Sequence, residues 1–237
     1  MTQSVPSAGT AARPRVPNWG RMIRVWGLLA MSMTGAALAC WAALPAPPPE
    51  PKGGAGALQD GAALLAAVWP KDMLAERPWR FIVIHHTATP GATIEALDQF
   101  HRDRDFPNGI AYHFIINNGR SAGTVDGEIT ATDRWRQQLD GAHCKVHNHP
   151  EFNTEGIGVC LVGNFEQQPP TTAQMAGLER LVLALQGRYH IPLERVLAHR
   201  ELKNTQCPGR LFPMDAFVRQ VRETYLRSRL LAPGPAD

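Results

Sequence analysis

Two histidines stand where predicted strands end, and with a cysteine in a following loop they have the chemistry of a zinc site. His85 follows the β-branched run 81–84, His199 ends a later strand, and Cys207 lies eight residues beyond His199 in a loop. A strand fixes the backbone while the adjoining loop leaves room for a substrate. Two imidazoles and one thiolate are good zinc ligands and leave a fourth tetrahedral position for water. Spacing alone leaves a second interpretation open, in which these residues serve only packing.

The elements that must position these residues alternate between strands and helices. Apolar runs bounded by turn residues predict strands, and apolar residues at helical spacing predict helices. The expected strands are 81–84, 111–116, 157–162 and 196–199, and the expected helices are 58–68, 94–100, one after a capping box of Thr171 and Gln174, and one opened by Pro213. This alternation predicts an α/β fold, a single domain with a central mixed β-sheet flanked by helices.

Composition and charge exclude some classes of protein. Of the 237 residues, 44% are hydrophobic and 19% are charged, which is enough apolar material for a core and too little net charge for a disordered polymer. The net charge of +3 comes from residues 1–57, which hold five Lys or Arg and one Glu, whereas the remaining 180 residues carry −1. A basic nucleic-acid-binding domain is therefore not expected, and we predict no nucleic-acid partner.

The N-terminal segment predicts export. Residues 25–44 contain no charged side chain, match the length of a membrane-spanning helix, and follow Arg21 and Arg24. The working domain is therefore expected on the periplasmic or cell-envelope side, anchored to the inner membrane. Cys40, directly after Ala39, leaves a lipoprotein open as an alternative, and cleavage leaves secretion open. The expected parts are a cytoplasmic basic N-terminus (1–24), a signal anchor or signal peptide (25–44), a Pro/Gly-rich linker (45–57), the working domain (58–230) and a flexible C-terminus (231–237).

Five stretches of the chain form an ordered set of motifs. They are 81–89, 110–116, 141–143, 156–164, and 198–201 with Cys207-Pro208. In this order they resemble the zinc N-acetylmuramoyl-L-alanine amidases, a family that includes the phage lysozyme-type amidases and the peptidoglycan recognition proteins. The resemblance covers roughly residues 79–226. It implies the amidase type 2 fold of these proteins, with peptidoglycan or muropeptides as partners; we expect a monomer.

The resemblance also implies a zinc ion held by His85, His199 and Cys207, with Tyr112 and Thr205 facing the metal. The implied reaction is hydrolysis of the amide bond between the lactyl group of N-acetylmuramic acid and L-alanine of the stem peptide. Zinc lowers the pKa of its bound water toward about 7, and the Tyr112 hydroxyl would donate to the developing oxyanion. Thr205 would position water or substrate rather than act as a base.

Three more residues are candidates for the site. Glu201, two residues after a ligand, is expected to orient a histidine, with general base as the alternative role. His143, in a Gly-Ala-His loop, is expected to contact the substrate, since a loop imidazole suits a polar glycopeptide. Trp135, between two arginines, is open to two interpretations, core packing or stacking on a sugar.

Other histidines and cysteines have plainer interpretations. His86 and His113 each directly follow a candidate site residue along a strand, so the strand period of two points them to the opposite face as packing residues. Cys144 and Cys160 allow a disulfide in an oxidising compartment. The apolar strand around Cys160 favours two free thiols instead.

Two other functions stay open. One is a non-catalytic module that binds peptidoglycan, and the other is a related hydrolase that acts on a different amide. Binding-only relatives have typically lost the zinc thiolate, so the presence of Cys207 favours catalysis.

Overall fold

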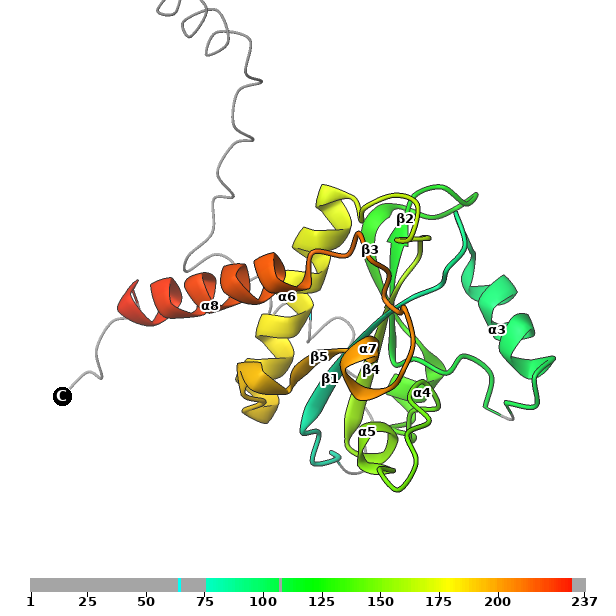
Figure 1. Ribbon diagram of the computed structural model, residues 1–237, viewed down its shortest axis with the longest axis horizontal. Coiled ribbons are helices and arrows are strands. Elements are labelled where there is room, and N and C mark those ends of the chain that lie inside the picture. The colour runs from blue at the N-terminus through cyan, green and yellow to red at the C-terminus, as the bar shows by residue number, and fades with distance from the viewer. Residues whose placement is uncertain (1–63, 65–75, 107, 232–237) are drawn as a thin grey trace, which may run out of the picture. The chain divides into compact units, whose positions relative to one another are not determined.

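A five-stranded mixed β-sheet lies at the centre of the computed structural model, which describes residues 64, 76–106 and 108–231 (Figure 1). The strand order is β3-β2-β4-β1-β5, in which β2 and β3 are antiparallel and the other neighbours are parallel. The strands are β1 (Phe81–His86), β2 (Phe114–Asn118), β3 (Asp126–Ala131), β4 (Gly156–Leu161) and β5 (Val196–Ala198). The predicted α/β class with a mixed sheet is confirmed.

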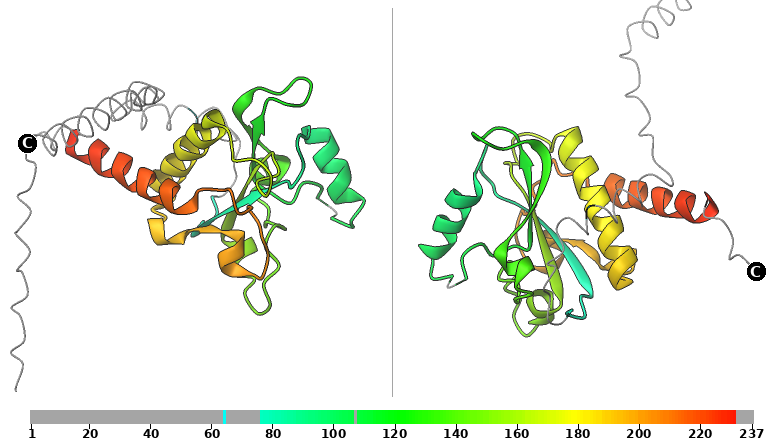
Figure 2. Two further views of the ribbon diagram at one scale, coloured as in Figure 1. Left: turned by 45° about the horizontal axis from the view of Figure 1, so that its top comes forward. Right: turned by 180° about the vertical axis from the view of Figure 1, so that it is seen from behind.

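Helices cover both faces of the sheet (Figure 2). α6 (Thr172–Tyr189) and α8 (Met214–Leu231) lie on one side, and α3 (Ile94–Arg102) lies on the other. A large apolar core forms on the α6 side and a smaller one on the α3 side. The short elements are α4 (Asp133–Arg136), α5 (Glu151–Thr154), the 3-10 helix η1 (Leu193–Arg195) and α7 (His199–Leu202).

The predicted capping box starts α6 and ties it to the sheet. The Thr171 hydroxyl accepts from the Gln174 N–H at 3.0 Å, and the Gln174 side-chain oxygen accepts from the Thr171 N–H at 3.2 Å. The amide nitrogen of Gln174 then donates to the carbonyls of Ile116, in β2, and Val162, at the end of β4. The start of this 18-residue core helix is thereby fixed against β2 and the end of β4.

The apolar face of α3 differs from the expected one. Phe100, the last apolar residue at helical spacing in the expected helix 94–100, is 49% exposed, with the Arg104 guanidinium 3.6 Å from its ring centroid. His101 is buried instead and bonds the Leu97 carbonyl through Nδ1 at 2.7 Å. The helical repeat explains this difference. His101 lies seven residues, or almost two full turns, after Ile94 and so shares its face of the helix, whereas residue 100 projects from a different face.

The largest departures from the expected strands concern β3 and β2, whereas the bounds of β1, β4 and β5 differ by one or two residues. β3 was not predicted, because it is an edge strand whose alternating residues are mostly polar or small. β2 begins three residues later than expected. The carbonyl of Tyr112, just before it, accepts from the Thr132 hydroxyl at 2.7 Å rather than from the sheet.

Several predictions concern residues that the structure does not describe. The segment 25–44, the linker 45–57, the thiol of Cys40, the C-terminal residues 232–237 and all of the expected helix 58–68 except residue 64 lie outside the described residues. Within the described ranges, no helix combines the length and apolar character needed to cross a bilayer.

His113 is a buried structural residue, as expected. Its side chain is fully buried, its Nδ1 accepts from the Gly158 N–H at 2.9 Å, and its Nε2 bonds the Leu139 carbonyl at 3.0 Å. Burial, with a further contribution from His143, lowers the pKa of His113 well below its ordinary value of 6.5. The ring is therefore neutral at pH 7 and joins β4 to a loop.

We predict that metal-free protein loses stability as the pH falls from 7 to 5. Because the folded-state pKa of His113 lies below the unfolded-state value, the unfolded chain binds a proton that the folded chain excludes. The free energy of unfolding, from denaturant titrations at each pH, should fall less steeply in His113→Asn, by up to about 1.4 kcal/mol per pH unit. Identical slopes for the variant and the wild type would contradict this role.

Candidate functional site

The ends of two paired strands bring His85 and His199 together. In the parallel pair β1–β5, Ile84 lies opposite Ala198, so the next residue of each strand is one of the histidines. Their ring centroids lie 4.5 Å apart. Cys207 Sγ lies 3.7 Å from His85 Nδ1, and the three potential ligand atoms all lie within 4.8 Å of one another. The sequence-predicted donor set is thus assembled in one place.

The loop that carries Cys207 folds back onto α7. The Arg200 N–H donates to the Cys207 carbonyl at 2.8 Å, and the Arg200 guanidinium donates to the Gly209 carbonyl at 2.8 Å. The Cys207 N–H donates to the Thr205 hydroxyl at 3.3 Å. These bonds hold the thiol against the helix that begins with His199.

Glu201 acts on the turn that presents His199. The Glu201 side chain is exposed, and its carboxylate accepts from the Ala198 N–H at the start of α7. That N–H belongs to the last residue of β5. The carboxylate therefore fixes the strand-to-helix turn on which His199 stands.

The protonation states of His85, His199 and Cys207 suit the binding of a metal ion. Burial, reinforced by neighbouring histidines, lowers the pKa of His85 well below 6.5, and burial beside Lys203 lowers that of His199 to about 4, so both imidazoles are neutral at pH 7. Burial raises the pKa of the Cys207 thiol to about 11, and its proton must leave when a metal binds. His199 Nε2 is buried without a hydrogen-bond partner among the described residues. A metal ion bound here would give the buried His199 Nε2 a partner.

Tyr112 lies beside His85. It is half-buried, and its ring centroid is 5.1 Å from that of His85. Burial raises the pKa of the Tyr112 hydroxyl well above 10, so it keeps its proton at neutral pH. The sequence-based search missed His101, whose ring contacts the Tyr112 ring at 5.5 Å. The sequence pattern that could have identified His101 is its position in line with Ile94 on the apolar face of α3.

The two residues expected to contact substrate are both buried. Trp135 has no exposed surface and packs on Phe114, with ring centroids 4.6 Å apart, as in the core-packing interpretation. His143 is 7% exposed, and its Nδ1 lies 3.1 Å from His85 Nε2. Burial lowers the pKa of His143 to about 3, against the opposing effect of its bond to the Gly156 carbonyl. The structure therefore places His143 directly behind a candidate ligand.

The remaining histidines and thiols take the plainer interpretations. His86 Nδ1 accepts from the Phe165 N–H at 3.2 Å, away from the donor set. His149 bonds Glu151 at 2.9 Å on the surface. Cys144 and Cys160 are buried free thiols, as favoured from the sequence.

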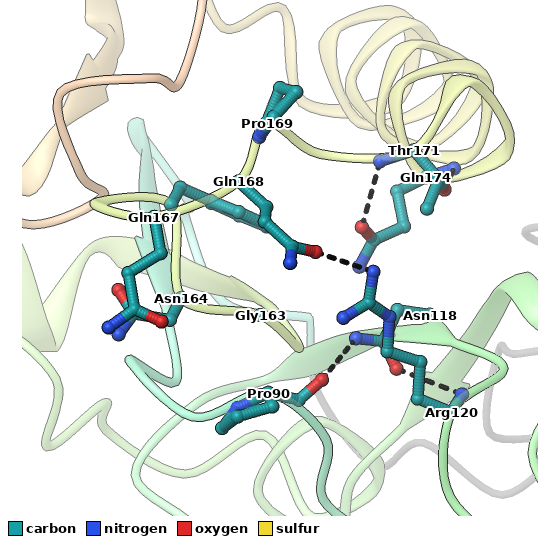
Figure 3. Close-up of a pocket in the computed structure, with 11 residues that line it drawn as sticks. Pro90, Asn118, Arg120, Gly163, Asn164, Gln167, Gln168, Pro169, Thr171 and Gln174 are labelled. Carbon is teal, nitrogen blue, oxygen red and sulfur yellow. Dashed lines mark hydrogen bonds between the residues drawn. The ribbon is translucent and has the colours of Figure 1, made fainter.

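A separate polar pocket of about 70 Å³ opens beside the ends of β2 and β4 (Figure 3). Several of its lining residues bond one another: the Asn118 amide donates to the Pro90 backbone carbonyl at 2.9 Å, and the Arg120 guanidinium donates to the Gln168 side-chain oxygen at 2.6 Å. The described residues that line it include none of the three donors. We therefore place the candidate site at the histidines and Cys207.

Comparison with known proteins agrees with this geometry. Residues 75–210, more than half of the chain, match the family model described as N-acetylmuramoyl-L-alanine amidase. The chain belongs to the N-acetylmuramoyl-L-alanine amidase family. All the candidate site residues lie within the matched range of this family.

The individual relatives share low sequence identity with this chain. The chain is 28% identical over 144 residues to an N-acetylmuramoyl-L-alanine amidase of Sus scrofa, covering 56% of this chain and 22% of the relative. It is 26% identical over 144 residues to peptidoglycan-recognition protein 2 of Holotrichia diomphalia, covering 57% and 70%. This chain spans less than a quarter of the length of the pig and human relatives that it matches.

One solved structure supports the fold directly. An endolysin N-acetylmuramoyl-L-alanine amidase from Clostridium intestinale matches with a TM-score of 0.52 and 28% identity, over 61% of this chain and 84% of that chain. The amidase fold expected from the motifs is therefore confirmed.

We predict that the full-length protein binds one zinc ion per chain. Cys207→Ala should weaken zinc binding by more than about 100-fold, because it removes a ligand rather than a partner of a ligand. Competition with a chromophoric chelator measures the affinity. Cys144→Ala, a buried thiol outside the donor set, is the matched control. If Cys207→Ala and the wild type bound zinc with equal affinity, Cys207 would not be a zinc ligand.

Proposed function

We propose that this protein is a zinc-dependent amidase that hydrolyses peptidoglycan between the lactyl group of N-acetylmuramic acid and L-alanine of the stem peptide. The observation that carries this proposal is the set of His85, His199 and Cys207 beside Tyr112, in a chain of the amidase family. Three protein ligands leave one tetrahedral position for the reacting groups.

Each residue at the site has a separate role in the proposed reaction. Zinc bound to this set would supply a Lewis acid and lower the pKa of a water toward about 7. The protonated Tyr112 hydroxyl donates a hydrogen bond to the substrate carbonyl oxygen as negative charge develops there. The Thr205 hydroxyl, beside Cys207, orients water or substrate. Glu201 holds the turn that carries His199, which agrees with the expected orienting role rather than with that of a base.

A non-catalytic recognition module is the second candidate, because some relatives are peptidoglycan-recognition proteins. The complete donor set favours hydrolysis, since a pure binding site has no need of a thiolate and two neutral imidazoles around one point.

We also propose that the domain works in the cell envelope, held to the inner membrane by residues 25–44. The support is the uncharged length of this segment and the two arginines before it. Peptidoglycan, the proposed substrate, would then lie on the same side of the membrane as the domain.

We predict that zinc-loaded full-length protein releases stem peptides from purified sacculi and that a chelator stops the release. Tyr112→Phe should lower kcat by about 10²- to 10³-fold at unchanged zinc affinity, because it removes one donor to the oxyanion. Mass spectrometry of the products locates the cut.

Tyr225→Phe, on the exposed side of α8, is the matched control and should keep full activity. Sacculi bound but left intact by the zinc-loaded wild type would reject the enzyme in favour of the recognition module. Full activity of Tyr112→Phe would reject its role as a donor.

A further inference from the structure

A chain of hydrogen bonds runs from a backbone carbonyl through His143 to His85. His143 Nε2 lies 3.2 Å from the Gly156 carbonyl oxygen, and His143 Nδ1 lies 3.1 Å from His85 Nε2. Both rings are buried. Cys207 Sγ lies at the far end of this chain, 3.7 Å from His85 Nδ1.

The direction of the chain follows from its first member. A carbonyl oxygen only accepts, so the proton of His143 is on Nε2 and its Nδ1 presents a lone pair. His85 must then donate from Nε2, which leaves the lone pair of His85 on Nδ1. That is the nitrogen nearest to Cys207, on the side of the expected metal. One backbone carbonyl thereby sets the tautomer of two imidazoles.

The space around the His143 ring is shaped to hold it. A Cβ at Gly158 on β4 would lie 2.3 Å from Cδ2 of His143, and a Cβ at Gly141 would lie 2.5 Å from the same atom. Both distances are shorter than packed carbon atoms tolerate, so side chains at these positions would displace the ring. Two segments far apart in the sequence therefore lack a side chain where the imidazole lies.

The backbone of His143 is fixed separately by Asn153. The Asn153 side-chain oxygen accepts from the N–H groups of His143 and Cys144, at 3.1 and 2.9 Å. Its amide nitrogen donates to the Cys144 carbonyl at 2.9 Å. The loop is thus held by an amide clamp from α5, independently of the imidazole bonds.

We propose that His143 is a positioning residue that holds His85 in the tautomer and ring orientation needed to bind the metal through Nδ1. This assignment rests on the proposed zinc site and replaces direct substrate contact as the role of His143. A histidine that binds zinc generally donates its other N–H to a fixed partner, and removal of such a partner weakens metal binding about 10- to 100-fold.

Zinc affinity of the full-length protein, measured by chelator competition, tests the proposal. His143→Ala should bind zinc about 10- to 100-fold more weakly than the wild type. His143→Asn keeps an acceptor oxygen near the position of Nδ1 and should restore most of the affinity. Cys144→Ala changes the next side chain in the same clamped loop and should leave the affinity unchanged. Folded His143→Ala with wild-type zinc affinity and a raised KM would assign His143 to the substrate and overturn the proposal.

A measurement on the unmutated protein covers the case in which the alanine variant fails to fold. In the metal-free wild type, nitrogen-15 NMR of the imidazoles should show His85 protonated on Nε2, whereas protonation on Nδ1 would overturn the proposal. The result is separable from that for the proposed function: intact sacculi with His143-dependent zinc affinity would reject the amidase and leave the positioning role standing.

Discussion

The parallel pairing of β1 with β5 is the contact on which the candidate site depends. It sets Ile84 opposite Ala198, so the residues that follow, His85 in β1 and His199 at the start of α7, lie side by side. A shift of one residue would turn one imidazole to the other face of the sheet. The larger apolar core holds this register, because Ile82 and Ile84 of β1 and Val196 and Ala198 of β5 all belong to it. The geometry of the site therefore depends on the apolar packing of the two strands that position its histidines.

The residues around His85, His199 and Cys207 hold these three side chains in position. Glu201 holds the turn before His199, Arg200 holds the loop of Cys207, and His143 holds His85 from behind. Burial keeps both ligand imidazoles neutral. A buried site of this kind disfavours an isolated charge. A divalent cation is favoured instead, because Cys207 loses its proton on metal binding and the thiolate partly balances the charge of the cation. The same low polarity keeps the Tyr112 hydroxyl protonated as a donor.

Much of this arrangement could be predicted from the sequence, because strand ends and ordered motifs are local signals. The strand before His85, the capping box at Thr171 and the donor set itself all agree with the structure. The edge strand β3 was missed because few apolar residues mark it. The position of His143 behind His85 was also missed, since it depends on a contact between a loop and a strand whose residues are 58 positions apart. A motif shows that a histidine matters but not whether it faces the substrate or a ligand.

The central claim is that two histidines and one cysteine hold a zinc ion with one open position. X-ray absorption at the zinc edge, on full-length protein loaded with one zinc per chain, tests it most directly. The account predicts one sulfur at about 2.3 Å, two imidazole nitrogens at about 2.0–2.1 Å and one further light atom at a similar distance. Two or more sulfurs would bring Cys144 or Cys160 into the coordination and close the site. That result, or a shell without sulfur, would contradict the account.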